Sequence, residues 1–241
     1  MTQLEDQIKS NEIAYRFGYF TAILTTVVTI ITFGIAVNTP PLAGPFCESG
    51  CFEYPYSDIA SRFPRDYIWM YPAMLLTLIY VALMVSIHYF APREKKIYSQ
   101  VGLSFALLAA APIIIDYFIQ VSVIQPSLLN GEHDGIALLT QFNAHGIFIA
   151  LEDFGYLMMS VSFLFMAFVF SKTNRLEKTI RWLFIASFIL TILALIFVSF
   201  KFGIHREYFF EVAAITINWA VLIVAGILLS KVFKRAMNPR E

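Results

Sequence analysis

Six stretches of about 20 apolar residues, with no lysine or arginine in their interiors, dominate this chain of 241 residues. They cover about residues 17–37, 67–90, 99–123, 144–171, 181–200 and 211–230. A helix needs roughly 20 residues to cross the hydrocarbon core of a bilayer. Because backbone groups in lipid must be satisfied internally, and because alternating ten-residue strands are absent, the sequence predicts helices. We therefore expect an all-α, polytopic transmembrane helical bundle with six spans, in which residues 1–241 form a single membrane domain.

The composition agrees with a membrane location and excludes two other classes of protein. Apolar residues make up 59% of the chain and charged residues 14%, whereas a soluble domain carries about 25% charged residues. This shortage of polar surface excludes a soluble globular enzyme. Lysine plus arginine and aspartate plus glutamate number 17 each, so there is no basic excess to hold nucleic acid. The partner that the composition predicts is the lipid bilayer.

The basic residues predict the orientation of the bundle in a cell membrane. Thirteen of them fall in segments 1–16, 91–98, 172–181 and 231–241, and four fall in the loops between the other span ends, namely Arg62, Arg65, Lys201 and Arg206. Cytoplasmic loops carry the excess of lysine and arginine. We therefore expect both termini to be cytoplasmic, and loops 38–66, 124–143 and 201–210 to lie on the non-cytoplasmic side of a multi-pass protein.

The largest outer loop, residues 38–66, contains both cysteines of the chain, Cys47 and Cys51. Disulfides persist in oxidising compartments, and the outer location therefore favours a structural disulfide between these two residues. A redox-active pair is the weaker alternative, because such pairs are usually separated by two residues. Residues 57–63 of the same loop are expected to form a short surface helix with Ser57 as its N-cap.

The second outer loop, residues 124–143, combines turn signals with an apolar segment. Gln125-Pro126 and Asn130-Gly131 are typical of turns. Residues 135–142 are apolar enough to enter the membrane interface, and they predict an interfacial or re-entrant helix. The sequence between Asn143 and Gly146 is expected to separate that helix from the fourth span.

Aromatic residues are abundant, with 24 phenylalanines in the chain. Tyr67, Trp69 and Tyr71 open the second span and resemble an aromatic belt at the membrane interface. We interpret the other aromatic residues as packing.

Four acidic residues fall inside spans that offer no basic partner: Asp116, Glu152, Asp153 and Glu211. A charged side chain at the membrane centre costs about 2.5–3.5 kcal/mol on insertion scales, so such residues usually face the bundle interior and mark functional sites. At 1.5 Å per residue, Asp116 lies roughly 10 Å and Glu152 roughly 12 Å below the outer ends of their spans. Two helices therefore offer carboxyl groups at one level, in the outer half of the membrane.

Helical spacing predicts which polar side chains share the faces of these acids. Asp116 and Gln120 are four residues apart; His145, Glu152 and Tyr156 are separated by seven and four; Glu211 and Asn218 are seven apart. If these stripes face inward, they form a polar pocket that opens outward. The predicted ligand-binding set is Asp116, Gln120, His145, Glu152, Tyr156, Glu211 and Asn218, with the acids holding a proton or cation and His145 at the outer mouth.

A metal site is an alternative use of the same residues. Asp116, His145 and Glu152 are candidate ligands for a mixed nitrogen and oxygen site. Their spacing matches no specific motif, because the spans contain neither a His-Glu-x-x-His nor a Glu-x-x-His pattern. The sequence therefore identifies no cofactor.

Three function classes remain open at this stage. The leading hypothesis is a transporter or receptor that binds a small cation, a proton or an amine. The second is a membrane-embedded enzyme, metal-dependent or not, in which His145 and the acids act on a lipid-like substrate. The third is a structural or assembly subunit without catalytic activity, in which the acids lock helix packing. The oligomeric state is left open by the sequence.

Overall fold

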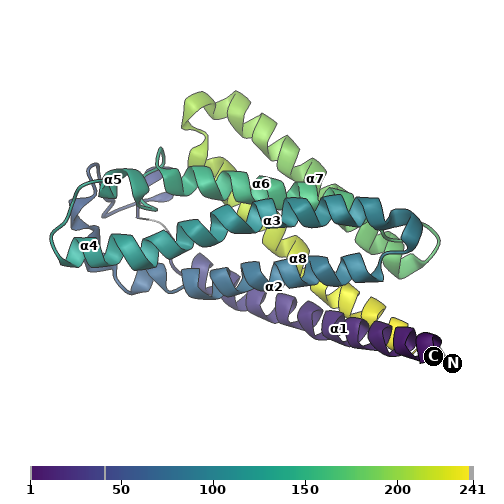
Figure 1. Cartoon of the computed structure of the whole chain (residues 1–241). Helices are drawn as coiled ribbons and strands as arrows, with labels where there is room; N and C mark the ends of the chain where they lie inside the picture. The colour runs from purple at the N-terminus through teal and green to yellow at the C-terminus, as the bar shows by residue number, and fades with distance from the viewer. Residues whose placement is uncertain (1, 41, 239–241) are drawn as a thin grey trace.

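The structure is a computed structural model that describes residues 2–40 and 42–238. It is 81% helical, and the described residues contain no strand. Six helical segments are long and apolar enough to cross a membrane: Glu12–Val37, Arg65–Phe90, Arg93–Leu129, Ile147–Ala167, Arg175–His205 and Tyr208–Met237. The predicted all-α fold with six spans is confirmed (Figure 1).

Six long helices form these spans, and shorter helical pieces extend them or lie in the loops. The long helices are α1 (Thr2–Val37), α2 (Met70–Phe90), α3 (Lys96–Ile119), α6 (Ile147–Ala167), α7 (Arg175–Phe202) and α8 (Glu207–Met237). A π-helical turn, Gln120–Ile124, joins α3 to α4 (Gln125–Leu129), and α5 is a single turn (Ile136–Leu139). Short 3-10 helices cover Gly44–Phe46, Ser57–Arg62, Arg65–Tyr67, Arg93–Lys95 and Gly203–His205.

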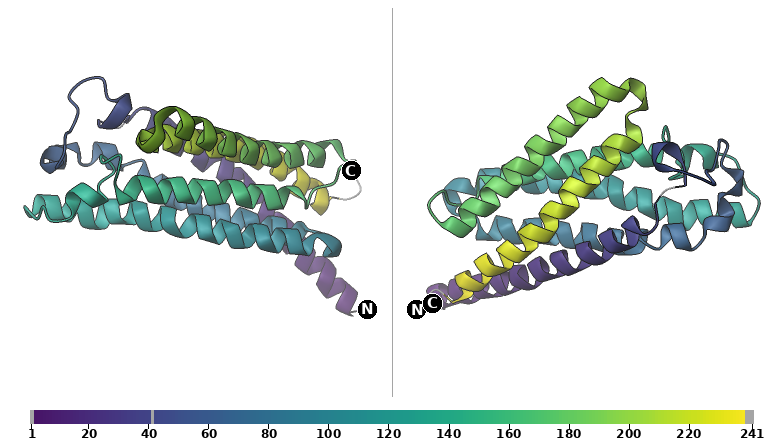
Figure 2. Two further views of the ribbon diagram at one scale, coloured as in Figure 1. Left: turned by 90° about the horizontal axis from the view of Figure 1, so that it is seen from above. Right: turned by 180° about the vertical axis from the view of Figure 1, so that it is seen from behind.

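The helices pack as an irregular bundle rather than as a parallel array. α3 packs along α6, α2 lies between α1 and α3, and α7 contacts both α6 and α8. Seen from behind, α8 crosses the bundle obliquely and meets α1 near the end where both termini lie (Figure 2). We call that end the termini end. The opposite end, which carries α4, α5 and the loop with the cysteines, is called the disulfide end.

Two glycines allow the closest helix contacts in the bundle. A Cβ atom at Gly226 of α8 would lie 2.6 Å from the carbonyl oxygen of Ala22 on α1. A Cβ atom at Gly155 of α6 would lie 2.5 Å from Cγ1 of Ile113 on α3. Small residues let membrane helices approach closely and gain van der Waals contact. These two contacts fix α8 against α1 and α6 against α3, and thereby set the positions of the side chains between them.

The structure corrects the predicted start of the second outer loop. Gln125-Pro126 does not form a turn, because the third span continues through it as far as Leu129. Proline is tolerated in the first turn of a helix, where its missing N–H has no intrahelical partner, and Pro126 occupies that place in α4. The chain turns instead at Asn130-Gly131, where Gly131 has a φ of +74°.

Two further details of the loops differ from expectation. The segment Ser57–Arg62 is a 3-10 helix whose N-cap is Tyr56, and no side-chain cap hydrogen bond is formed, so Ser57 is not the cap. Within residues 135–142 only Ile136–Leu139 is helical. The following residues Thr140, Gln141 and Phe142 are buried in a bend and turn at the disulfide end of the bundle.

The cysteine pair agrees with the sequence analysis. The sulfur atoms of Cys47 and Cys51 lie 2.05 Å apart, which is the distance of a disulfide bond. The bond closes a turn in the loop that follows α1. Which side of the membrane this end faces remains the prediction made from the basic residues.

Candidate functional site

Three of the acids in spans come together inside the bundle, each from a different helix. Asp116 of α3, Glu152 of α6 and Glu211 of α8 are 1%, 0% and 9% exposed. The carboxyl groups of Glu152 and Glu211 lie within hydrogen-bonding reach of each other. Asp116 lies close enough for its charge to interact with both of them. We call these three residues the carboxyl cluster.

Two tyrosines extend the cluster into a hydrogen-bonded network. The hydroxyl group of Tyr117 on α3 donates to Oε1 of Glu152. The same hydroxyl lies 3.0 Å from that of Tyr156 on α6, within hydrogen-bonding distance. Sequence reasoning found Tyr156 by its helical spacing and missed Tyr117, which it treated as packing. The sequence signal that could have identified Tyr117 is its place directly after Asp116, at the same depth as the buried acids.

Asn218 joins α8 to this network. Its amide Nδ2 donates to the backbone carbonyl of Tyr156 at 3.2 Å and to that of Ala214 at 2.8 Å. A bond to the backbone of another helix is satisfied only while the two helices keep their distance. Asn218 therefore holds α8, and with it Glu211, in register with α6.

Several buried polar atoms of the site receive no hydrogen bond from an N–H or O–H group of the described residues. They are Oδ2 of Asp116, Oε2 of Glu152, Oε2 of Glu211 and Oδ1 of Asn218. The salt bridges found among the described residues join Arg62 and Arg65 to Asp66, and they leave the carboxyl cluster without a basic partner. An unpartnered buried polar group is costly. Such groups are retained where they have a function or where a ligand satisfies them.

A cavity of about 340 Å³ lies against Glu211 at the disulfide end. Its walls are largely apolar, and seven aromatic rings line it: Phe33, Phe46, Trp69, Phe142, Phe148, Tyr208 and Trp219. The two tryptophans are in edge-to-face contact, with ring centroids 6.5 Å apart. We call this space the aromatic cavity.

The tryptophans also connect the aromatic cavity to the buried network. The ring of Trp69 lies 5.1 Å from that of Tyr117, and the ring of Trp219 lies 6.4 Å from that of Tyr156. Trp69 was assigned to an interfacial belt together with Tyr67 and Tyr71, but only Tyr71 is exposed. The belt interpretation is wrong for Tyr67 and Trp69 because both side chains are buried, Trp69 against the rings of Tyr117 and Trp219.

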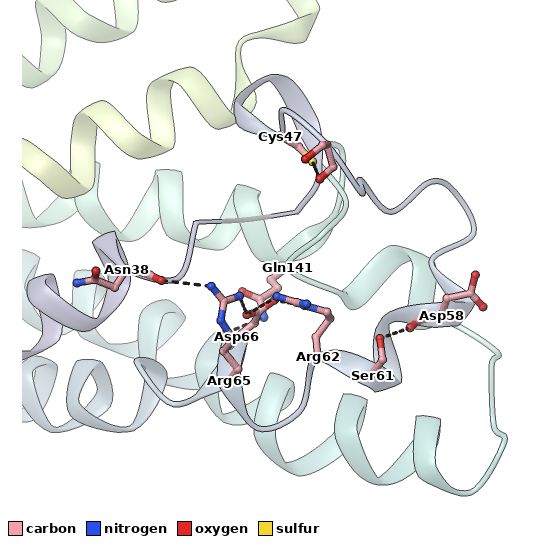
Figure 3. Close-up of polar contacts among 9 residues, drawn as sticks. Asn38, Cys47, Asp58, Ser61, Arg62, Arg65, Asp66 and Gln141 are labelled. Carbon is pink, nitrogen blue, oxygen red and sulfur yellow. Dashed lines mark hydrogen bonds and ion pairs between the residues drawn. The ribbon is translucent and has the colours of Figure 1, made fainter.

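An ion-pair cluster centred on Asp66 forms one rim of the aromatic cavity, whose lining includes Asp66 and Gln141. Figure 3 shows the contacts of this cluster. The carboxylate of Asp66 accepts from Nε of Arg62 at 2.7 Å and from Nη1 of Arg65 at 2.8 Å. Nη2 of Arg65 also donates to the carbonyl oxygen of Asn38, at 3.3 Å, just beyond the end of α1. Nε2 of Gln141 donates to the carbonyl oxygen of Asp66 at 3.2 Å. These bonds tie the start of α2 to the end of α1 and to the segment after α5.

Tyr208 also belongs to this rim, and Tyr56 lies close enough to interact with it. The hydroxyl of Tyr208, at the start of α8, donates to the carbonyl oxygen of Gln141 at 2.8 Å. Partial burial raises the pKa of Tyr56 in the outer loop, so its phenol stays neutral at physiological pH. The rim is thus held by hydrogen bonds from neutral groups and by one carboxylate that two guanidinium groups already neutralise.

Gln120 is buried but is not part of the cavity wall. Its amide Nε2 donates to the carbonyl oxygen of Leu139 at 2.6 Å, and its Oε1 accepts from the backbone N–H of Gln141 at 3.1 Å. Both polar atoms of the Gln120 amide therefore hold the segment after α5. The helical spacing placed Gln120 near Asp116 correctly, but its hydrogen bonds go to the loop backbone.

His145 also lies apart from the carboxyl cluster. α6 begins at Ile147, so the helical stripe from His145 to Glu152 does not exist. His145 lies beside His205, with ring centroids 5.8 Å apart, and lines a second cavity of about 570 Å³ between α6 and α7 together with Asp153 and Arg206. The candidate metal ligands Asp116, His145 and Glu152 are thus divided between two places. Residues 2–40 and 42–238 hold no group of three or more His, Cys, Asp or Glu side chains placed for a metal.

Comparison with protein-family models, with curated proteins and with solved structures finds no match to this chain. Its function is therefore inferred from the geometry of the site.

Proposed function

We propose that this integral membrane protein binds a small organic cation, an amine or quaternary ammonium with an apolar body, as a transporter or a receptor. The observation that carries the proposal is the position of Glu211. Glu211 lines a largely apolar cavity, is nine-tenths buried, and its Oε2 receives no hydrogen bond from an N–H or O–H group of the described residues.

The volume and the lining of the aromatic cavity support a small-molecule ligand. Ligand pockets typically measure about 300–1,000 Å³ and are mainly apolar with a few placed polar groups. The faces of aromatic rings attract cations, and quaternary ammonium groups are recognised by cages of such rings. A cation in the cavity, against the rings of Trp69 and Trp219, would gain this attraction, and Glu211 would supply the opposite charge.

The charges around the cavity disfavour an anion. Glu211 and Asp66 both line it. The guanidinium groups of Arg62 and Arg65 are engaged by Asp66 and by the backbone of Asn38. An anionic ligand would therefore have to displace existing ion pairs, whereas a cation would meet a carboxyl group that has no basic partner among the described residues.

Binding of a matched pair of compounds to the purified protein tests the proposal. Benzyltrimethylammonium and 2,2-dimethylpropylbenzene have the same shape, but only the first is charged. We expect the cation to raise the unfolding temperature and the uncharged compound to raise it less. A tenfold preference for the cation corresponds to about 1.4 kcal/mol of binding free energy.

Two variants assign the effect to the site. Glu211→Gln keeps the shape of the side chain and removes its charge, so we expect the preference for the cation to disappear. Asp58→Asn removes one charge from an exposed position at the same end of the bundle and serves as the matched control. Equal binding of both compounds, or a preference that survives in Glu211→Gln, would contradict the proposal. Uptake of the cation into proteoliposomes then separates a transporter from a receptor.

A further inference from the structure

Glu152 and Glu211 meet across the interface of α6 and α8, within hydrogen-bonding reach of each other. An ionised carboxylate only accepts hydrogen bonds, and a protonated carboxyl group has one O–H donor. A hydrogen bond between the two groups therefore requires one proton on the pair. Tyr117 donates its hydroxyl proton to Oε1 of Glu152.

The charged and titratable groups around the pair make a second ionised carboxylate unfavourable. Asp116 faces it from α3 and Asp153 from α6, and both interact with Glu211 as like charges. The phenols of Tyr117, Tyr156 and Tyr208 surround it as neutral groups on α3, α6 and α8. At the rim of the aromatic cavity, the guanidinium groups of Arg62 and Arg65 are held by Asp66.

Glu211 belongs to the pair and also to the wall of the aromatic cavity. Glu152 lies behind it and is fully buried. The same carboxyl group thus faces a proton-sharing partner on one side and the ligand space on the other. A positive charge that enters the cavity would take the place of the proton as the counter-charge of Glu211.

We propose that the Glu152–Glu211 pair holds one shared proton when the aromatic cavity is empty, and that binding of an organic cation expels this proton. The inference rests on the proposed function and adds that binding is an exchange of one cation for one proton. The O–H bond of the pair breaks, its electron pair remains on the carboxylate, and the proton passes to water at the rim of the aromatic cavity. The net charge of the site is the same before and after the exchange.

Tyr117 has a positioning role in this exchange. Its hydrogen bond to Oε1 of Glu152 orients that carboxyl group and stabilises negative charge on it. The hydroxyl group of Tyr156, 3.0 Å away, fixes the rotation of the Tyr117 hydroxyl. The pair therefore keeps a hydrogen-bond donor after the proton has left.

Calorimetric titration with benzyltrimethylammonium measures the number of protons released. This probe carries a permanent charge and no exchangeable proton, so any proton that appears comes from the protein. The titration is run at one pH in two buffers that differ in their enthalpy of ionisation. We expect release of about one proton per bound cation and, over the range in which the pair is protonated, affinity that rises about tenfold per pH unit.

Infrared difference spectroscopy supplies a second readout. We expect the carbonyl band of a protonated carboxylic acid to decrease when the cation binds. Glu152→Gln removes the partner of the shared proton and keeps Glu211 in the cavity. In this variant we expect the cation to bind, with fewer protons released and a smaller loss of the band. Tyr89→Phe, an exposed position on α2, is the control that should leave proton release unchanged.

The outcomes separate this inference from the proposed function. Wild-type protein that does not bind the cation would overturn the proposed function. Cation binding without proton release, with affinity independent of pH, would leave the proposed function standing and overturn the exchange. Full proton release in Glu152→Gln would also overturn it, because the released proton would then be held without Glu152, by Glu211 alone or by another group.

Discussion

The hydroxyl group of Tyr117 donates a hydrogen bond to Oε1 of Glu152 across the interface of α3 and α6. Both side chains are fully buried. Tyr117→Phe would keep the ring and leave a buried carboxyl oxygen without its donor, which costs about 1–3 kcal/mol. We expect a lower free energy of unfolding for this variant, measured by denaturant titration in detergent. Tyr89→Phe at an exposed position should change it little, and equal losses in both variants would contradict the assignment.

The contact between α1 and α8 requires a glycine at position 226. A Cβ atom there would lie 2.6 Å from the carbonyl oxygen of Ala22, so Gly226→Ala should cost about 1–3 kcal/mol through overpacking. Gly34 on α1 has no heavy atom within 4 Å of such a Cβ atom. Gly34→Ala should therefore be neutral or stabilise the helix by about 0.5–1 kcal/mol. Thermal unfolding of the two variants tests this contrast, and a Gly226→Ala protein as stable as the wild type would refute the close approach of the two helices.

Asp66 holds the rim of the aromatic cavity through two arginines and should be sensitive to substitution. Asp66→Asn removes the charge that both guanidinium groups share, and hydrogen bonds to charged groups contribute about 1.5–3 kcal/mol each. We expect faster amide hydrogen exchange in residues 38–39 and 65–69 and in residues 140–142. The exposed acid Asp58 provides the control, since Asp58→Asn should leave exchange in these segments unchanged. Unaltered exchange in Asp66→Asn would show that the rim does not depend on this cluster.

The cysteine pair tests the orientation of the bundle. We expect mass spectrometry without reduction to find Cys47 bonded to Cys51 in protein taken directly from the membrane. After reduction, a membrane-impermeant maleimide should label these cysteines from outside intact cells. Lys178→Cys, introduced together with Cys47→Ser and Cys51→Ser, should react only after the membrane is permeabilised. The reverse pattern would place the disulfide end in the cytoplasm.

The spans and the acids that they contain could be predicted from the sequence, because hydropathy and the cost of buried charge are local properties. Asp116, Glu152, Tyr156, Glu211 and Asn218 meet as the spacing within single helices predicts. Their use in ligand binding remains a prediction.

The rest of the site depends on contacts that no single segment determines. Gln120 has the right spacing from Asp116, but its amide bonds to the backbone of residues 139–141, whose position is set by the whole disulfide end. The predicted stripe of His145, Glu152 and Tyr156 requires a helix that starts before Gly146, whereas α6 begins at Ile147. Trp69 comes from the segment before α2 and Trp219 from α8. Only tertiary packing brings these two walls of the aromatic cavity together.

A structure of the protein in complex with benzyltrimethylammonium would show directly whether Glu211 holds the cation. We predict density in the aromatic cavity, with the quaternary nitrogen facing the carboxyl group of Glu211 and lying against the rings of Trp69 and Trp219. Density only in the cavity between α6 and α7, or a saturated complex in which Glu211 makes no contact with the cation, would contradict cation binding at this site.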